Sequence, residues 1–146
     1  MIKIIVFGKI KTTELLRLKE EYLKRLGRFT KLELLEWKET NFNKDNKRII
    51  NYFNEHKNEK IILMDEAGKT YSTEKFNAQL KNWEENKITT FIIGRAEGFD
   101  KTVKETIKEK ISLSPMTFTH EMAQVLLLEQ IYRVMTLRAG IPYHKG

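Results

Sequence analysis

Segments typical of β-strands alternate with segments typical of α-helices five times along the 146 residues. Apolar and β-branched runs predict strands at residues 2–7, 32–37, 61–64, 88–93 and, interrupted by Pro115, 111–118. Apolar residues three and four apart predict helices at 12–26, 44–56, from Ser72 or Thr73, from Asp100, and at 120–137. This order predicts a single α/β domain over residues 1–146, with a mostly parallel sheet and helices on both faces.

Two short segments bear on the details of this sheet. Residues 32–37, LELLEW, fit a helix as well as a strand, and residues 65–69, DEAGK, predict a turn after the third strand. Ligands of parallel sheets bind beyond the carboxyl ends of the strands. The loops after Met64, Ile93 and Leu113 are therefore the places to expect a binding site.

The last predicted helix is apolar on nearly all sides. Its large apolar residues cover more than one stripe: Met122, Val125, Leu126, Leu127, Leu128, Ile131, Val134, Met135 and Leu137. A helix of this kind is buried on two sides. One side is expected to contact a second subunit, which predicts a homodimer; the alternative is a central core helix of a monomer.

The charge of the chain is basic and unevenly distributed. The net charge is +7, and residues 1–58 hold 14 Lys and Arg against 8 Asp and Glu. A basic surplus in one half favours a polyanionic partner, of which RNA is the commonest. The alternative is a lysine-rich hydrated surface typical of an A/T-rich genome, and charge alone does not decide between the two.

The composition also bears on the cellular compartment. The absence of cysteine excludes disulfides, thiolate metal ligands and a cysteine nucleophile, and it suits a reducing compartment. The apolar run at residues 4–7 is too short for a signal-peptide core or a membrane span. We therefore expect a cytoplasmic protein without a membrane segment.

Metal and serine chemistry find no support in the sequence. The segment beginning at His120, HEMAQ, lacks the second histidine of the zinc motif H-E-x-x-H, so no metal site is predicted. No serine has the glycine context of a nucleophile elbow. His120 is expected to open the last helix, where it has a structural role or faces a ligand.

Two segments are candidates for ligand contact, a loop that contains glycines and the aromatic C-terminal tail. Residues 94–100, GRAEGFD, join a predicted strand to a helix, and their glycines let the backbone approach a ligand; a tight turn explains them equally well. In the tail, Tyr143 can stack on a base, while His144 and Lys145 can reach a phosphate or a transferable proton. A floppy terminus is the ordinary alternative for the tail.

These residues together resemble a known family. The run LSPMTFTHEMAQVLLLEQIYRVMTLRAGIPYHKG at 113–146 is similar to the RlmH family of the SPOUT methyltransferases, the 23S rRNA pseudouridine N3-methyltransferases. The resemblance covers the whole chain. It includes Gly8-Lys9, Glu21-Tyr22, Arg25-Leu26, Gly68-Lys69, IIGRAEGF at 92–99, Met116-Thr117-Phe118, His120, Glu129-Gln130, Tyr132-Arg133 and Tyr143-His144-Lys145.

The resemblance implies a specific fold and activity. It implies an α/β sheet with a C-terminal deep trefoil knot, a homodimer, and methylation of N3 of a pseudouridine in 23S ribosomal RNA of the assembled ribosome. The methyl donor is S-adenosylmethionine. The family's cofactor contacts map onto Met64, Gly94, Leu113, Ser114, Pro115, Met116, Thr117 and Phe118.

Methyl transfer to the imide nitrogen of a uracil ring requires alignment with the methyl carbon and loss of the imide proton. The candidate catalytic residues are His144, Tyr143, Arg133 and Lys145. His144 is a candidate for the general base that accepts the proton, and the other three are candidates for groups that stabilise the deprotonated, anionic uracil ring. We expect the tail to position the RNA base, with the tail of one subunit completing the pocket of the other. The expected RNA contacts are Lys24, Arg25, Arg28 and Lys145.

Two positions depart from the family pattern. Arg95 replaces the second glycine of a pair, and Gln124 replaces an arginine. We expect both to border one pocket, where Arg95 supplies the positive charge that Gln124 lacks; the alternative is an exposed Arg95 without a role. These departures favour a competing function, a non-enzymatic RNA-binding or ribosome-assembly factor. A small nucleotide-binding α/β protein unrelated to RNA is the third alternative.

Overall fold

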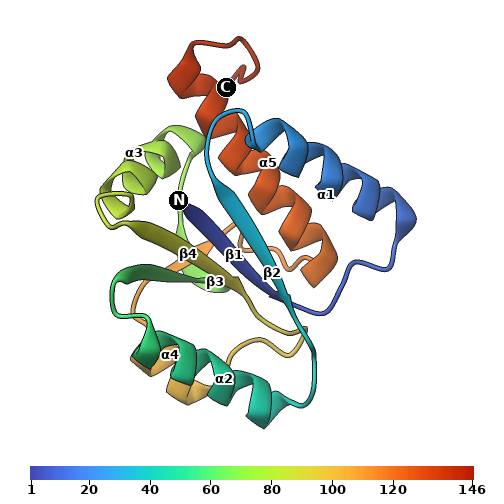
Figure 1. Cartoon of the computed structure of the whole chain (residues 1–146), viewed down its shortest axis with the longest axis vertical. Coiled ribbons are helices and arrows are strands. Elements are labelled where there is room, and N and C mark those ends of the chain that lie inside the picture. The colour runs from blue at the N-terminus through green and yellow to red at the C-terminus, as the bar shows by residue number, and fades with distance from the viewer.

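Five strands and five helices make up most of the chain in the computed structural model, which describes all 146 residues (Figure 1). The strands are β1 (Ile2–Phe7), β2 (Leu32–Trp37), β3 (Glu59–Thr70), β4 (Ile88–Ile93) and β5 (Lys110–Ser112). The helices are α1 (Thr13–Leu26), α2 (Phe42–Glu55), α3 (Thr73–Trp83), α4 (Lys101–Thr106) and α5 (His120–Ala139). The predicted alternation is confirmed, and residues 32–37 form a strand. None of the helices has the length and apolar character that crossing a membrane requires.

The strands form one sheet in the order β2-β1-β4-β3-β5, and all neighbouring pairs are parallel. In this register Ile2 of β1 aligns with Leu32 of β2 on one side and with Thr89 of β4 on the other. Parallel neighbours need crossover connections, which the helices provide. Because all strands run in the same direction, their carboxyl ends meet at one edge of the sheet.

Helices cover both faces of this sheet, α1, α3 and α5 on one and α2 and α4 on the other (Figure 1). Alternate side chains of each strand supply the two halves of the core. In β1, Ile4 and Val6 pack with α5, whereas Ile5 and Phe7 pack with α2 and α4. The predicted α/β domain with helices on both faces is confirmed.

Helix α5 is buried on two sides, as its composition predicted, but both sides lie within one chain. It packs against the sheet, with α1 and α3 beside it. Leu128 and Ile131 are completely buried there. The expectation that the excess apolar surface faces a second subunit is wrong for these residues, because the sheet and the neighbouring helices cover them. The homodimer stays a prediction that must rest on other surfaces.

Strand β3 does not end in a turn at residues 65–69, as the sequence predicted. It continues to Thr70 with a bulge, because Met64 and Lys69 both align with Ile111 of β5. At Gly68 a Cβ atom would lie 2.8 Å from the Ile111 backbone nitrogen. The glycine therefore serves a close approach of two strands, which a local pattern cannot distinguish from a turn.

The extended segment predicted at 111–118 is shorter than expected. β5 ends at Ser112, and the following residues form the loop that leads to α5. Pro115 has no N–H group to donate to a strand ladder. The Thr119 hydroxyl then accepts a hydrogen bond from the Met122 N–H at 3.2 Å and caps α5. The trefoil knot implied by the resemblance does not follow from strand order and stays a prediction.

Candidate active site

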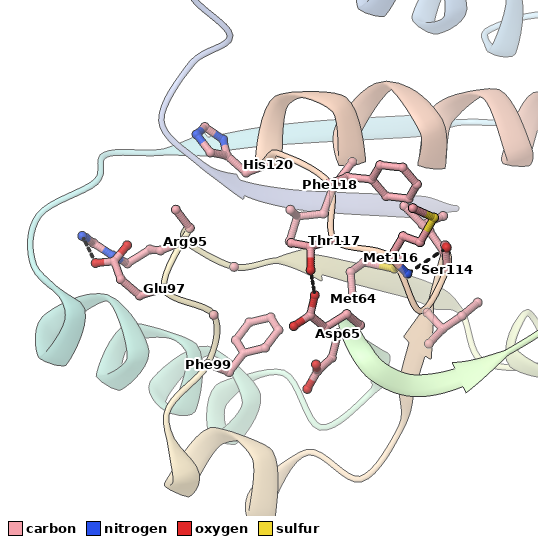
Figure 2. A pocket seen from close by; sticks show the side chains of 18 of the residues that line it. Met64, Asp65, Arg95, Glu97, Phe99, Ser114, Met116, Thr117, Phe118 and His120 are labelled. Carbon is pink, nitrogen blue, oxygen red and sulfur yellow. Dashed lines mark hydrogen bonds and ion pairs between the residues drawn. The ribbon is translucent and has the colours of Figure 1, made fainter.

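A cleft of about 240 Å³ lies at the carboxyl edge of the sheet. Its walls come from the bulge of β3, the β4–α4 loop, the β5–α5 loop and the first turn of α5 (Figure 2). Parallel sheets bind their ligands at this edge. The cleft therefore lies where the loops after Met64, Ile93 and Leu113 were expected to form a site.

Seven of the eight predicted cofactor-binding residues line this cleft: Met64, Gly94, Leu113, Ser114, Met116, Thr117 and Phe118. Pro115 is exposed and lies outside the lining. The seven come from three separate segments, which are brought together because β4, β3 and β5 are neighbours in the sheet. Their role in binding a cofactor stays a prediction.

Hydrogen bonds fix the β5–α5 loop against the cleft. The Ser112 hydroxyl donates to the Ser114 carbonyl oxygen at 2.7 Å, and Ser114 Oγ accepts from the Met116 N–H at 3.0 Å. The Thr117 hydroxyl donates to the Glu66 carboxylate in the bulge of β3 (Figure 2). These contacts leave the Met116 side chain 75% exposed at the rim of the cleft.

Gly94 is required by the packing of Phe99. A Cβ atom at position 94 would lie 2.8 Å from the Phe99 ring, which is buried. Gly98 has φ +82°, a left-handed conformation that side chains other than glycine rarely adopt. The strand-to-helix turn thus accounts for both glycines, and it leaves the backbone of Gly94 in the wall of the cleft.

A second cavity of about 170 Å³ adjoins the cleft and is lined mostly by apolar residues. Leu113, Ile111 and Phe118 line both spaces. Tyr71 and Phe76 add aromatic surface to the second one. The β5–α5 loop therefore separates a charged space from an apolar one.

The charged side chains of the cleft favour a cationic ligand. The lining contains three acidic and two basic side chains: Asp65, Glu66, Glu97, Arg95 and Lys104. One Asp65 oxygen accepts from the Ala67 N–H at 3.0 Å, while the other lacks a hydrogen bond and lies 3.9 Å from Lys104 Nζ. A surplus of carboxylates raises the local concentration of cations. Sequence reasoning missed Asp65 and Glu66 because the turn predicted there would have pointed them to solvent.

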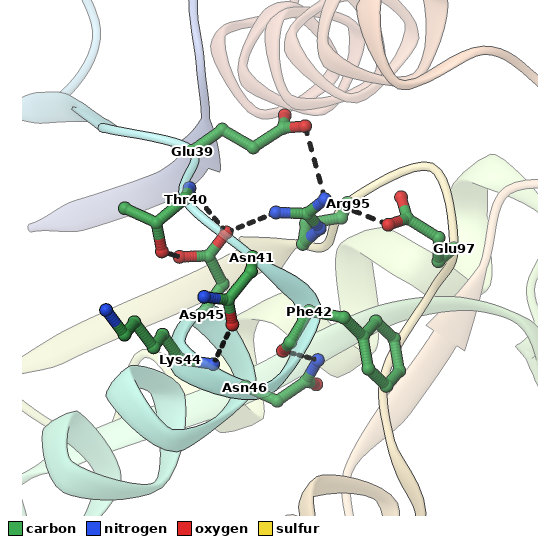
Figure 3. A network of polar contacts seen from close by, with 9 residues as sticks. All are labelled: Glu39, Thr40, Asn41, Phe42, Lys44, Asp45, Asn46, Arg95 and Glu97. Atoms are coloured by element: carbon green, nitrogen blue, oxygen red, sulfur yellow. Dashed lines mark hydrogen bonds and ion pairs between the residues drawn. The ribbon is translucent and has the colours of Figure 1, made fainter.

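Arg95 lines the cleft but is held by carboxylates (Figure 3). Its guanidinium lies 2.5 Å from Asp45, 2.9 Å from Glu97 and 3.5 Å from Glu39. Burial by itself raises the pKa of Asp45, but hydrogen bonds from Thr40 and the ion pair with Arg95 hold it below its ordinary value. The backbone of Arg95 does not have a positive φ, so an arginine in place of the family's glycine carries no cost from a left-handed conformation.

The expected compensation between Arg95 and Gln124 is wrong. Gln124 is 1% exposed, lies outside the cleft lining, and accepts a hydrogen bond from Lys19 Nζ at 3.2 Å. Lys19 of α1 is itself 3% exposed and pairs with Glu36 at 3.1 Å. The positive charge beside Gln124 thus comes from α1. No local pattern indicates this contact, because a lysine on an amphipathic helix is almost always exposed.

Tyr143 of the C-terminal tail packs against α1 and α5. Its hydroxyl donates to Glu129 at 3.2 Å and lies 3.3 Å from the Tyr22 hydroxyl, and its ring packs against Tyr132. Burial raises the pKa of Tyr143, and the Tyr22 hydroxyl and the Glu129 carboxylate raise it further. The floppy terminus considered from the sequence is not what the structure shows.

His144 is fixed between α5 and α3. Its Nδ1 accepts from Arg133 at 3.1 Å, and its Nε2 lies 2.8 Å from the Glu74 carboxylate. The structure therefore brings together the three predicted catalytic residues Tyr143, His144 and Arg133. None of them lines the cleft of the same chain.

The predicted RNA-binding residues lie on the same side as the tail. Lys24 is exposed in the last turn of α1, Arg28 is exposed in the turn that follows this helix, and Lys145 is exposed in the tail. Arg25 pairs with Glu21 at 2.9 Å. The contact between Tyr22 and Tyr143 brings the tail to this end of α1, and none of these cations lines the cleft of the same chain.

His120 is the residue whose position the sequence left open. It is the first residue of α5, it is half-buried, and it lines the cleft beside the β5–α5 loop (Figure 2). It has no hydrogen bond or ion pair within the chain. No cluster of three or more His, Asp or Glu residues is placed to hold a metal ion.

A family model described as predicted SPOUT methyltransferase matches residues 1–144. The chain belongs to the SPOUT methyltransferases. Relatives named ribosomal RNA large subunit methyltransferase H include that of Caldicellulosiruptor bescii, 40% identical over 156 aligned residues, 99% of this chain and 100% of the relative. That of Thermus thermophilus is 36% identical over 126 residues, 86% of this chain and 85% of the relative. The resemblance to the RlmH family is confirmed.

The fold of this SPOUT protein is shared with a solved structure. A probable methylase family protein from Haemophilus influenzae superposes with a TM-score of 0.58 over 99% of this chain and 70% of that chain. The two sequences are 10% identical, so the likeness concerns the fold alone.

Proposed function

We propose that this SPOUT protein transfers a methyl group from S-adenosylmethionine to large-subunit ribosomal RNA. The observation that carries the proposal is the cleft: seven positions at which the family contacts its cofactor converge at the carboxyl edge of the sheet. The relatives named ribosomal RNA large subunit methyltransferase H support the RNA substrate. Such a substrate implies a cytoplasmic reaction.

The residues of the cleft fit S-adenosylmethionine chemically. Its adenine and thioether carbons need apolar contacts, which Met64, Leu113 and Phe118 offer; its sulfonium and ammonium groups are cationic and suit a lining with a carboxylate surplus. When bound, the cofactor supplies a methyl group on positively charged sulfur. We assign Ser114, Met116 and the other lining residues of the β5–α5 loop to holding it.

Within this reaction class, N3 of a pseudouridine is the acceptor that the family resemblance favours. An imide nitrogen carries a proton at neutral pH, so the protein must hold the ring in line with the methyl carbon and accept that proton. The basic surface of Lys24, Arg28 and Lys145 provides phosphate contacts for an RNA of the assembled ribosome.

The active form is proposed to be a homodimer in which each tail completes the other subunit's cleft. Tyr143, His144 and Arg133 lie together but outside the cleft of their own chain. Exposed apolar side chains suited to an interface occur on α1, where Leu18 is 41% exposed, and at the cleft rim, where Phe118 is 41% exposed. A symmetric dimer brings the basic tail of one chain to the cleft of the other.

Subunit complementation tests this arrangement. One variant lacks residues 143–146, and the other carries Met116→Arg, an exposed cation at the cleft rim that repels a cationic cofactor. Each alone should be inactive on ribosomes that lack the modification. Because half of the mixed dimers are hybrids with one complete site, unfolding and refolding the two together should restore about a quarter of wild-type activity. A monomer by light scattering, or no recovery on mixing, contradicts the proposed dimer.

A binding-only assembly factor is separated from an enzyme by titration with S-adenosylmethionine. We expect heat in calorimetry and a higher Tm for the wild-type chain, since a ligand that binds only the folded state stabilises it. No heat and no Tm shift, together with unimpaired ribosome binding, would favour the assembly factor instead.

A further inference from the structure

We propose that His120 accepts the imide proton of the RNA base during methyl transfer. The inference rests on the proposed methyl transfer and adds a residue that neither the family's cofactor contacts nor the tail provides. It follows from which ionisable side chains of the cleft already have partners and which one does not.

Every other ionisable side chain of the cleft has at least one hydrogen bond or ion pair within the chain. Glu66 accepts a hydrogen bond from Thr117, and Arg95 and Glu97 form an ion pair at 2.9 Å. Asp65 accepts from a backbone N–H through one oxygen, and its second oxygen, which lacks a hydrogen bond, forms an ion pair with Lys104 at 3.9 Å. His120 is the one ionisable side chain of the lining that has no such partner.

His120 differs from these groups in three ways. It has no hydrogen bond or ion pair, and it is half-buried in the cleft wall. Its backbone belongs to the first turn of a 20-residue helix whose preceding residue, Thr119, is a side-chain cap. An imidazole on a rigid element, in a lining that it shares with the predicted cofactor loop, meets the requirement that a general base be held in a fixed position.

Glu121, the charged neighbour of His120 in the helix, forms no hydrogen bond with the imidazole. Glu121 accepts from the backbone N–H groups of Lys11 at 3.0 Å and Thr12 at 3.4 Å. The Lys11 N–H holds the pKa of Glu121 below its ordinary value, so this carboxylate stays charged and fastens the β1–α1 segment to α5. Its hydrogen bonds go to these two backbone groups and not to the imidazole of His120.

His144, the other histidine considered for this role, is already engaged at both ring nitrogens. Arg133 donates to one, and the Glu74 carboxylate lies at the other. A ring held in this way can orient the RNA base, but it cannot take a proton without breaking the Arg133 contact. His144 is therefore a positioning residue in this assignment.

The proton transfer balances with the proposed reaction. The N3–H bond of the base breaks, its proton passes to a free ring nitrogen of His120, and its electron pair remains on N3. That pair forms the new bond to the methyl carbon as the carbon–sulfur bond breaks, with the sulfur keeping the second pair. The imidazolium then loses its proton to water.

Chemical rescue tests the assignment. His120→Ala is assayed on ribosomes from a strain without the modification, with and without free imidazole, alongside His144→Ala. As a control, His56→Ala removes an imidazole that stacks on Tyr52 outside the cleft. Calorimetry with S-adenosylmethionine and the Tm of each variant show whether the fold and the cofactor site are intact.

We expect His120→Ala to lower kcat by about 100-fold or more, as loss of a general base does, with cofactor affinity within a few-fold of wild type. Imidazole should restore activity to His120→Ala in proportion to its concentration and leave His144→Ala and the control unchanged. If His120→Ala does not fold, His120→Gln replaces it with the same expected loss.

Two results overturn the assignment: activity of His120→Ala or His120→Gln within about threefold of wild type, or rescue of His144→Ala in place of His120→Ala. The wild-type reaction is measured in the same assay. Its absence would refute the proposed function, whereas an active wild type with active His120 variants refutes only the role of His120.

Discussion

Lys19→Met is the substitution whose effect the structure predicts most directly. Lys19 is 3% exposed and has two partners, the Glu36 carboxylate at 3.1 Å and Gln124 Oε1 at 3.2 Å. Methionine keeps the length of the side chain and removes the charge. Glu36 is 32% exposed and becomes hydrated, so no buried charge is left behind.

The substitution lowers the free energy of unfolding because it leaves the buried amide of Gln124 without a hydrogen-bond partner. Its Nε2 already lacks a partner, and loss of Lys19 leaves Oε1 without one as well. A buried polar atom without a hydrogen bond costs about 1–3 kcal/mol. For a chain of this length, about 2 kcal/mol lowers the Tm by roughly 4–8 °C. Lys24→Met, on the exposed side of the same helix, should stay within about 0.5 kcal/mol of wild type.

A double-mutant cycle with Gln124→Leu distinguishes this explanation from a general loss of packing. Gln124→Leu alone deprives the buried ammonium of a partner and should also destabilise the fold. The double variant has neither group, so it should be more stable than the sum of the single effects predicts, by about 1–2 kcal/mol. Urea and thermal unfolding followed by circular dichroism measure both. Additive effects within about 0.5 kcal/mol, or a Lys19→Met protein as stable as wild type, would refute the reasoning.

Four further outcomes follow from the contacts. Burial and Glu59 raise the pKa of Tyr52 to about 12, so the stability it confers is complete below pH 10 and is lost between about pH 10 and 12; Tyr52→Phe should flatten that part of the unfolding profile. Hydrogen bonds from Thr90 and Tyr52 outweigh burial and lower the pKa of Glu59, so its contribution should disappear as pH falls below about 4.5, and a stability flat down to pH 2 contradicts this. Gly68→Ala should lower the Tm and weaken S-adenosylmethionine binding together, because the added Cβ forces β5 away from β3. Reversing the charge of Lys24 and Arg28 should weaken ribosome binding and reduce its salt dependence while calorimetry shows unchanged cofactor affinity; equal weakening by reversal of Lys101 on α4 would mean plain surface charge.

The sequence by itself determined the order of the elements and the edge at which the site lies. Strand and helix patterns depend on neighbours two to four residues away, so they can be read locally. The rule for parallel sheets then points to the loops after Met64, Ile93 and Leu113, and these do line the cleft. Asp100 likewise caps α4 through a hydrogen bond from Val103, only three residues away, and the sequence indicated a helix that begins there.

Only the tertiary structure decided which residues meet across the chain. Gly68 faces β5, Lys19 faces Gln124 105 residues away, and Arg95 pairs with Asp45 rather than compensating for Gln124. The apolar excess of α5 likewise has its partners in the sheet and α1. These contacts depend on strand order and helix packing, which bring distant segments together. No local pattern carries that information, because a lysine or a glycine has the same neighbours in the sequence whether it ends in solvent or against another strand.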